Sequence, residues 1–189
     1  MFSTRLFLLF CVSMAIVLAL PSASTWGAEL AYLKLEGSRQ GIIKGESYQP
    51  ALKDAIAIYA VEHEINVPYD LSAGMATGKR VYEPIKLIKR IDKSSPLLCR
   101  ALVESEMMKS FVLYFFRIND KGESELYYTI SLKNAVITSY KLKKLNQMEA
   151  AFQNYDEMEE IMVTFSEITW FHTLENLEST DSLIDRKGS

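Results

Sequence analysis

From residue 30 onward, apolar residues recur mostly at every second position, and this pattern most constrains what the chain can fold into. The segment LAYLKLEG alternates through Leu33 and Leu35, and AIAIYAVEHEI alternates through Ile56, Ile58 and Ala60. A period of two residues is typical of strands that bury one face and expose the other. The chain is therefore predicted to be mainly β.

Two further segments extend this pattern towards the middle of the chain. IKLIKRI places Ile85, Leu87 and Ile91 near one face. FVLYFFRI, residues 111–118, is apolar on both faces, which predicts a strand that is central or covered on each side. The sequence NDKG at residues 119–122 has good turn chemistry, so a hairpin to the following ELYYTISL is predicted.

Near the carboxyl end, EIMVTFSEITWFH alternates through Val163 and Phe165, but its next apolar residue is Ile168. The step of three residues breaks the period of two. We expect one strand here, with a β-bulge near Ser166 and Glu167.

One segment departs from the strand pattern and predicts a single α-helix. In SSPLLCRALVESEMM, Ser95 is a candidate cap, Pro96 suits the first helical position, and Leu98 and Leu102 fall four residues apart. The predicted helix has about three turns, near the mean for globular proteins. Its apolar stripe should cover an open end or face of the sheet structure.

The first residues have the features of a targeting segment. Arg5 precedes an uninterrupted run without charge, Leu6–Leu20, and small residues follow at 21–24. At about 1.5 Å per residue this run spans about 22 Å, which is short of the roughly 30 Å hydrocarbon core of a bilayer. Residues 1–24 are therefore predicted to be a cleaved signal peptide. The protein should be periplasmic or secreted, without stable membrane insertion after cleavage.

The mature chain is then predicted to be one mainly β domain, residues 25–172, followed by a loose polar tail, residues 173–189. Removal of the signal leaves Cys99 as the only cysteine, so no disulfide can form within one mature chain. The mature chain has 20 basic and 24 acidic residues, a net charge of −4. A nucleic-acid partner is not expected, because binders of nucleic acid carry basic surfaces.

Catalytic and metal-binding patterns are weak in this sequence. His63 lies between two glutamates in VEHEI, but alternation sends its side chain to the opposite face from both, so a solvated strand edge is the simpler interpretation. Cys99 is best read as a small buried hydrophobic residue. The acidic run at 156–160 is typical of a solvated turn. The sequence predicts no enzyme activity, cofactor or metal.

A connection of about 15 residues, NVPYDLSAGMATGKR, separates two predicted strands. Connections of this length are uncommon in compact domains and are usually functional or disordered. Apolar residues such as Leu71 and Met75 argue against disorder, because they need a covering surface. Two interpretations remain open: the hairpin folds back on its own barrel, or it projects as an arm and docks on another subunit.

The order of these motifs resembles the Hcp family, the hemolysin-coregulated tube proteins of type VI secretion. The resemblance spans most of residues 30–172 and includes YLKLEG, YYTISLKNAVI and ITW. The matching residues around the long connection and the helix are Val67, Pro68, Asp70, Ser72, Gly74, Thr77, Gly78, Lys79, Arg80, Val81, Pro84, Ile91, Asp92, Lys93, Ser94, Ser95, Pro96, Leu97, Leu98, Ala101 and Leu102.

The resemblance implies a two-sheet β-barrel with one lateral α-helix and a long projecting hairpin loop. It also implies hexameric rings that stack into a tube, a pore that can carry small effectors, and contacts with other components of the secretion system. In the family the hairpin reaches towards the next ring. The ring-stacking loop would then be formed by Val67, Pro68, Asp70, Ser72, Gly74, Thr77, Gly78, Lys79 and Arg80.

The predicted signal peptide favours a second hypothesis. Family members usually lack such a leader and leave directly from the cytoplasm. An exported chain would miss assembly there, so the alternative is a periplasmic monomeric β-barrel that binds a small ligand and has left the secretion apparatus.

Overall fold

The chain folds as a mainly β structure in a computed structural model that describes residues 31–72 and 74–183. The described part contains one α-helix, α2 (Ser95–Val103), and two short 3-10 helices, η1 (Pro50–Leu52) and η2 (Ala150–Phe152). The strands of the body are β1 (Ala31–Gly37), β2 (Gly41–Ile43), β3 (Ile56–Ile58), β4 (Ala60–Glu62), β9 (Ile85–Arg90), β10 (Met107–Ile118), β11 (Ser124–Lys133), β12 (Ala135–Lys143), β13 (Met158–Thr164), β14 (Glu167–His172) and β15 (Leu177–Ser182).

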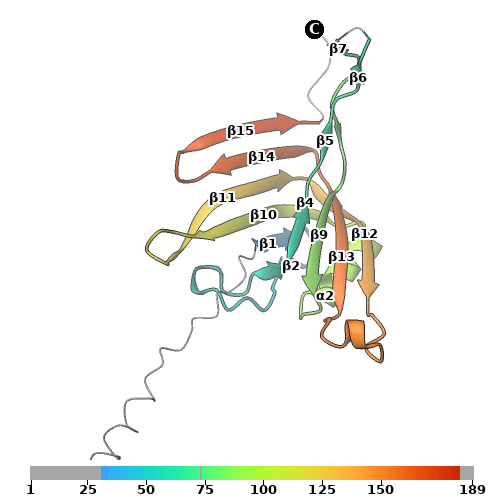
Figure 1. The fold of residues 1–189 in the computed structure, drawn as a ribbon, viewed down its shortest axis with the longest axis vertical. Helices are drawn as coiled ribbons and strands as arrows, with labels where there is room; N and C mark the ends of the chain where they lie inside the picture. Colours follow the sequence, from blue (N-terminus) through green and yellow to red (C-terminus); the bar gives the residue numbers. More distant parts are fainter. Residues whose placement is uncertain (1–30, 73, 184–189) are drawn as a thin grey trace, which may run out of the picture.

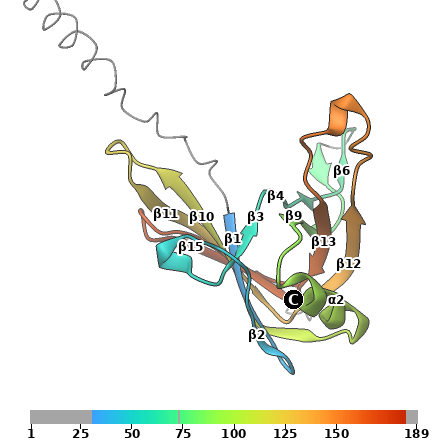
Figure 2. The same ribbon diagram turned by 90° about the horizontal axis from the view of Figure 1, so that it is seen from below.

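These strands form one 11-stranded sheet that curls into a half-barrel. Its main path runs β15-β14-β11-β10-β12-β13-β9-β4, and β1 adds to β10 and carries β2 and β3. Figure 2 shows β10, β11 and β15 on one side of the molecule and β9, β12 and β13 on the other. The predicted mainly β fold with one lateral helix is thus confirmed, and its two sheets are halves of one continuous sheet.

The chain passes between the two halves at three corners, and the alternation of buried residues shifts by one position at each. At Tyr59 the chain leaves β3, where Ile58 is buried, for β4, where Ala60 is exposed. At Asn134, whose φ is 50°, β11 gives way to β12. The prediction that Ala60 shares the face of Ile58 is wrong, because a corner separates them.

The third corner lies between Thr164 and Glu167, where a β-bulge in one strand was expected. The structure instead ends β13, which pairs with β12 and β9, and starts β14, which pairs with β11 and β15. Phe165 and Ser166 form the corner itself. The step of three residues therefore marks a change of sheet half, and the predicted bulge is wrong.

The concave side of the curled sheet holds a single apolar core. Phe111 and Leu113 of β10 are 1% and 0% exposed, and β10 is central, as its sequence predicts. Burial of each large apolar side chain contributes about 1.5–3 kcal/mol to folding. The buried core cluster comprises Leu33, Leu35, Ile43, Ile56, Ile58, Ile85, Leu87, Leu98, Ala101, Met108, Phe111, Leu113, Ile130, Leu132, Ala135, Ile137, Ile161, Val163, Phe165 and Ile168.

The hairpin between β10 and β11 forms as predicted. Gly122 has a φ of 78°, a left-handed conformation that glycine adopts without strain. The Asn119 Oδ1 accepts hydrogen bonds from the backbone N–H groups of Lys121 at 3.0 Å and Glu123 at 2.9 Å. These bonds fix the turn, and with it the register of the two longest strands.

The helix α2 is shorter than the sequence suggests and starts differently. Ser94, not Ser95, occupies the N-cap position, where its side chain makes no capping hydrogen bond, and Pro96 falls in the first turn. The helix ends at Val103 after nine residues, where Ser105 takes a left-handed φ of 49° and the chain turns towards β10, which starts at Met107. It packs laterally against β12, with Leu98 and Ala101 buried in the core.

The expected loose tail is wrong for most of the described part of residues 173–189. Leu177–Ser182 form β15, which pairs along its length with β14 in antiparallel register. The segment LESTDS does not alternate apolar and polar residues, so its sequence does not predict a strand. Edge pairing to an existing strand supplies the hydrogen bonds without needing a buried face.

Candidate functional site

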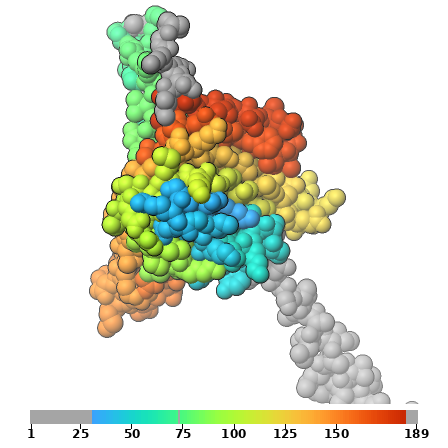
Figure 3. Space-filling model, turned by 180° about the vertical axis from the view of Figure 1, so that it is seen from behind, coloured from blue at the N-terminus to red at the C-terminus, as the bar shows by residue number. Residues whose placement is uncertain are grey.

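The long connection between β4 and β9 stands out from the body as an antiparallel hairpin, hereafter the arm, residues 65–82 (Figure 1). Its lower part pairs β5 (Ile65–Asn66) with β8 (Val81–Tyr82), and its upper part pairs β6 (Tyr69–Asp70) with β7 (Met75–Ala76). The space-filling view shows the arm rising clear of the rest of the chain (Figure 3).

Local chemistry explains why the arm holds its shape without a core. The Asp70 Oδ1 accepts hydrogen bonds from the backbone N–H of Ser72 at 2.8 Å and from its hydroxyl at 2.6 Å. Gly74 has a φ of 64° and donates its N–H to the carbonyl oxygen of Asp70 at 2.9 Å. The ring of Pro68 lies against Gly78, where an added Cβ would approach to 3.2 Å. Each of these residues therefore has a backbone role in the arm.

The arm exposes apolar side chains that the body does not cover. Leu71 is 91% exposed, Met75 is 68% exposed and Tyr69 is 58% exposed. Exposed apolar groups gathered in one place are typical of surfaces that bind another macromolecule. All nine residues assigned by resemblance to a stacking loop lie in this arm, and their role in stacking stays a prediction.

The base of the arm is fastened to β15. The guanidinium of Arg80 pairs with the carboxylate of Asp181 and donates to the carbonyl oxygen of Ser182 at 3.0 Å. The Tyr82 hydroxyl donates to the Asp181 Oδ2 at 2.6 Å. The sequence does not predict this role for Asp181, because residues 173–189 are polar and lack periodicity. Arg80 is therefore engaged within its own subunit.

An aromatic cluster lies beside this fastening. The imidazole ring of His63 has centroid distances of 6.2 Å to Tyr82, 5.9 Å to Trp170 and 6.5 Å to Phe165. Both imidazole nitrogens are buried and have no hydrogen-bond partner within the described part of the chain. Burial lowers the pKa of His63. The expected solvated strand edge is wrong, because the arm base and β14 fold over this ring.

A buried polar network ties β9, β12 and β13, which lie in one half of the sheet, to the start of α2. The Lys89 Nζ, on a side chain that is 1% exposed, lies 2.6 Å from the Glu159 Oε2 and 2.9 Å from the Asp92 Oδ1. The Ser95 hydroxyl donates to the same Glu159 oxygen at 2.8 Å, and the Tyr140 hydroxyl donates to Glu159 Oε1 at 2.7 Å. A buried charge is tolerated only when it is paired and hydrogen-bonded in this way.

This network corrects two predictions. Lys89, rather than Ile91, completes the buried face of β9, and Ile91 is 50% exposed. The acidic run at 156–160 is not simply a solvated turn, because Glu159 is 1% exposed. Alternation alone places a lysine and a glutamate at inward positions, but only their pairing across two strands makes that burial favourable.

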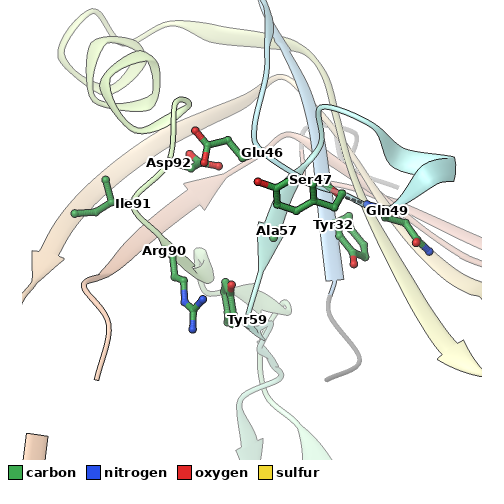
Figure 4. Close-up of a pocket in the computed structure, with 10 residues that line it drawn as sticks. Tyr32, Glu46, Ser47, Gln49, Ala57, Tyr59, Arg90, Ile91 and Asp92 are labelled. Carbon is green, nitrogen blue, oxygen red and sulfur yellow. Dashed lines mark hydrogen bonds between the residues drawn. The ribbon is translucent and has the colours of Figure 1, made fainter. Parts of the chain in front are cut away.

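An open cavity of about 500 Å³ lies beside this network, with Asp92 on its lining. Figure 4 shows Arg90 beside Tyr59 at one end, Glu46 and Asp92 at the other, and Tyr32 on a side wall. The Arg90 guanidinium lies 4.9 Å from the centre of the Tyr59 ring. The pocket offers aromatic walls with charges of both signs, which suits binding rather than chemistry.

Other candidate groups do not form reactive sites in the described residues. Cys99 is partly exposed on α2, not fully buried as expected. No cluster of three or more His, Cys, Asp or Glu side chains with metal-binding geometry occurs in residues 31–72 and 74–183. Over the same residues, no helix combines the length and apolar character needed to cross a bilayer. The predicted signal peptide, residues 1–24, lies outside the described residues.

Both the sequence and the fold of this chain are similar to those of known proteins. The family model described as "Type VI secretion system effector, Hcp" matches residues 32–172. The "Major exported protein" of Pseudomonas aeruginosa is 30% identical over 160 residues, which cover 80% of this chain and 93% of that protein.

Solved structures agree with the sequence comparison. A structure described as an Hcp protein has a TM-score of 0.77 and 30% identity, covering 85% of this chain and 100% of the other. The secreted protein Hcp3 from Pseudomonas aeruginosa has a TM-score of 0.68 and 26% identity, covering 82% and 98%. Sequence and fold agree along nearly the whole described chain, and the protein belongs to the Hcp family of type VI secretion system proteins.

Proposed function

We propose that this protein is a non-enzymatic, ring-forming tube protein and secreted effector of a type VI secretion system. Its partners would be five further copies in a hexameric ring, the rings above and below, other components of the secretion system, and small effectors in the pore. The observation that carries the proposal is the arm, which presents Tyr69, Leu71 and Met75 to solvent on a hairpin anchored to a well-packed body.

The shape of the subunit supports assembly. A closed ring needs a heterologous interface, in which one patch of a subunit meets a different patch of the next. The main path of the curled sheet ends in the edge strands β15 and β4. The arm adds a third surface, which leaves the body along the long axis of the molecule and is free to contact another ring (Figure 1).

The test is the mass of the purified full chain by size-exclusion chromatography with light scattering. The proposal predicts a particle of six times the chain mass. A particle of one chain mass at every protein and salt concentration would overturn the ring, and the stacking with it.

The alternative is a periplasmic monomer that binds a small ligand. The open cavity of about 500 Å³ favours it, because that volume falls in the range of small-molecule pockets. Light scattering separates the two candidates directly. Sequencing the amino terminus of protein recovered from culture supernatant tests the export route, and a terminus at Thr25 would establish cleavage after Ser24.

A further inference from the structure

The arm joins the body through the two segments that flank it, and the imidazole ring of His63 lies where they meet. His63 comes two residues before the arm begins, and its ring stacks on that of Tyr82, the last residue of the arm, with the two planes 17° apart. Figure 1 shows the arm leaving the body beside β14 and β15. Any swing of the arm against the body therefore has to disturb this pair of rings.

Two aromatic rings of the body complete the contact. The ring of Trp170 in β14 is centred 5.9 Å from that of His63 and 6.5 Å from that of Tyr82. Phe165, in the corner before β14, meets the Tyr82 ring edge to face at 5.5 Å. These four residues are hereafter the latch. Only histidine among them has an ordinary pKa that lets it gain a charge near neutral pH.

The latch does not meet the polar needs of the His63 ring. Both ring nitrogens are buried, and neither has a hydrogen-bond partner among the described residues. A neutral imidazole leaves one N–H donor and one acceptor unpaired, whereas an imidazolium leaves two donors and a positive charge unpaired. Burying an unpaired charge costs far more than burying an unpaired neutral group. The closed latch therefore favours the neutral ring, and burial lowers the pKa of His63.

The charged groups on the other side of Tyr82 do not offset this cost. The carboxylate of Asp181 in β15 already pairs with the Arg80 guanidinium and accepts from the Tyr82 hydroxyl at 2.6 Å. The Arg80 guanidinium lies 5.7 Å from the centre of the Tyr82 ring. It is a positive charge close to the latch, and it makes a second one at His63 less favourable.

The other carboxylates on the strands around the latch are exposed or engaged elsewhere. They are Glu62, which pairs with Lys86, Glu64, which accepts from the Asn66 amide, Glu167, which pairs with Lys133, and the exposed Glu83. Alternation along the strand also sends Glu62 and Glu64 to the face opposite His63. Among the described residues, no negative charge is therefore placed to stabilise an imidazolium in the latch.

We infer that His63 is a proton-sensitive switch for the arm, whose neutral ring holds the base of the arm against the body and whose protonation in mild acid releases it. The closed latch disfavours the proton. Closure is therefore fully favoured above the ordinary histidine pKa of about 6.5, and it weakens as pH falls from there towards the lowered pKa of the closed state. Release would let the exposed Leu71 and Met75 change position relative to the body.

Hydrogen exchange at the base of the arm tests this switch. The Glu83 N–H donates to the Glu64 carbonyl oxygen at 3.2 Å, beside the latch, so its exchange reports opening there. The rate in the full chain is divided by the rate in His63→Phe at the same pH, which cancels the pH dependence of the exchange chemistry. Phenylalanine keeps a ring in the stack but cannot take a proton. The ratio should rise at least about fivefold from pH 7 to pH 5.

The backbone amide of Leu113 in β10 is the matched internal control, and its ratio should stay constant over the same range. A constant ratio at Glu83 would overturn the switch. A ratio at Glu83 that falls in acid would overturn it as well, because the imidazolium would then be held in place, as a cation–π contact with the Trp170 ring would hold it.

A titration without a substitution at His63 covers the case in which His63→Phe fails to fold. The chain has two histidines, so His172→Asn leaves the ring of His63 as the one histidine signal in protein carrying ¹³C-labelled histidine. Its midpoint, followed by NMR, should lie below about 6.5. A midpoint at or above that value would overturn the switch.

The switch belongs to the single subunit, so it can be separated from the proposed stacking. Electron micrographs of the same preparations show whether rings stack. The predicted change in exchange, found in rings that never stack, would support the switch and overturn the stacking function. A constant exchange ratio in rings that do stack would overturn the switch alone.

Discussion

The body and the arm both contain large apolar residues, but these residues are buried in the body and exposed on the arm. In the body, Phe111 and Leu113 lie in long paired strands and are almost completely buried, whereas Leu71 and Met75 of the arm lie on a hairpin whose paired strands are two residues each. Burial of apolar area stabilises the fold only where the same chain covers that area. The apolar residues of the body therefore contribute to folding, and those of the arm remain available for binding.

The largest expected contrast comes from truncating one apolar side chain in each region. Phe111→Ala should lower the free energy of unfolding by about 3–5 kcal/mol, because a cavity replaces a buried ring. Leu71→Ala should change it by less than about 0.5 kcal/mol, as expected for an exposed site. Urea unfolding measures both. Similar losses would mean that the arm packs on its own body.

The buried polar network should behave like the core rather than like the surface. Glu159→Gln leaves the Lys89 ammonium with a weakened partner in a buried site and should cost about 3 kcal/mol of unfolding free energy. The matched control is Glu157→Gln, which removes a carboxylate that pairs with Lys144 on the surface and should have little effect. Equal effects of the two variants in urea unfolding would refute a structural role for the network.

A smaller, pH-dependent effect is expected at Glu106. Burial raises the pKa of this carboxyl, but hydrogen bonds from the backbone N–H of Gln40 and Arg39 and from the Gln40 side chain outweigh it and lower the pKa. A lowered folded pKa gives stability that is present above the ordinary glutamate value of about 4.3 and is lost as pH falls through the folded pKa. Thermal unfolding from pH 6 downward should show this loss.

Glu106→Gln is the matched variant for that pH series. Its midpoint of thermal unfolding should be lower at neutral pH and should fall less steeply in acid than that of the natural chain, because the titrating carboxyl is gone. Parallel curves for the two proteins would exclude Glu106 as a source of acid sensitivity.

The smallest expected effect on stability concerns the joint between arm and body. Asp181→Asn removes the charge that holds Arg80 and accepts from Tyr82, so the base of the arm should loosen while the core stays intact. Hydrogen exchange of the arm amides, such as Thr77 N–H to Pro68 carbonyl, should accelerate, with the exchange of β10 unchanged. Thr180→Ala on the same strand serves as the control. Acceleration by both variants alike would point to loss of β15 instead.

The sequence predicts the strands of the body better than it predicts the corners between the two halves of the sheet. The reason is physical. Alternation predicts a strand and its buried face, as for β1 and β10, because the period of two follows from backbone geometry alone. A shift in that alternation has two causes, a bulge or a change of sheet, and at Phe165 and Ser166 only the partners of each strand distinguish them. The break at Asn134 has the same origin.

The candidate site was only partly predictable. The composition of residues 66–80 and their resemblance to a known family pointed to the arm. The fastening through Asp181 depends on a polar edge strand more than 100 residues away, and no local pattern predicts such a contact. The prediction for His63 is wrong for a similar reason, because the aromatic rings around it come from two segments that are distant in the sequence, the base of the arm and the start of β14.

The central claim is that the body is sufficient for the ring and the arm is needed only between rings. The most direct measurement compares stack length in electron micrographs of the natural chain and of the double variant Leu71→Ser, Met75→Ser, with the mass of each particle taken by light scattering. The account predicts rings of six subunits in both preparations, with the rings joined into stacks only in the first. Unchanged stacks in the double variant, or its dissociation into single subunits, would contradict it.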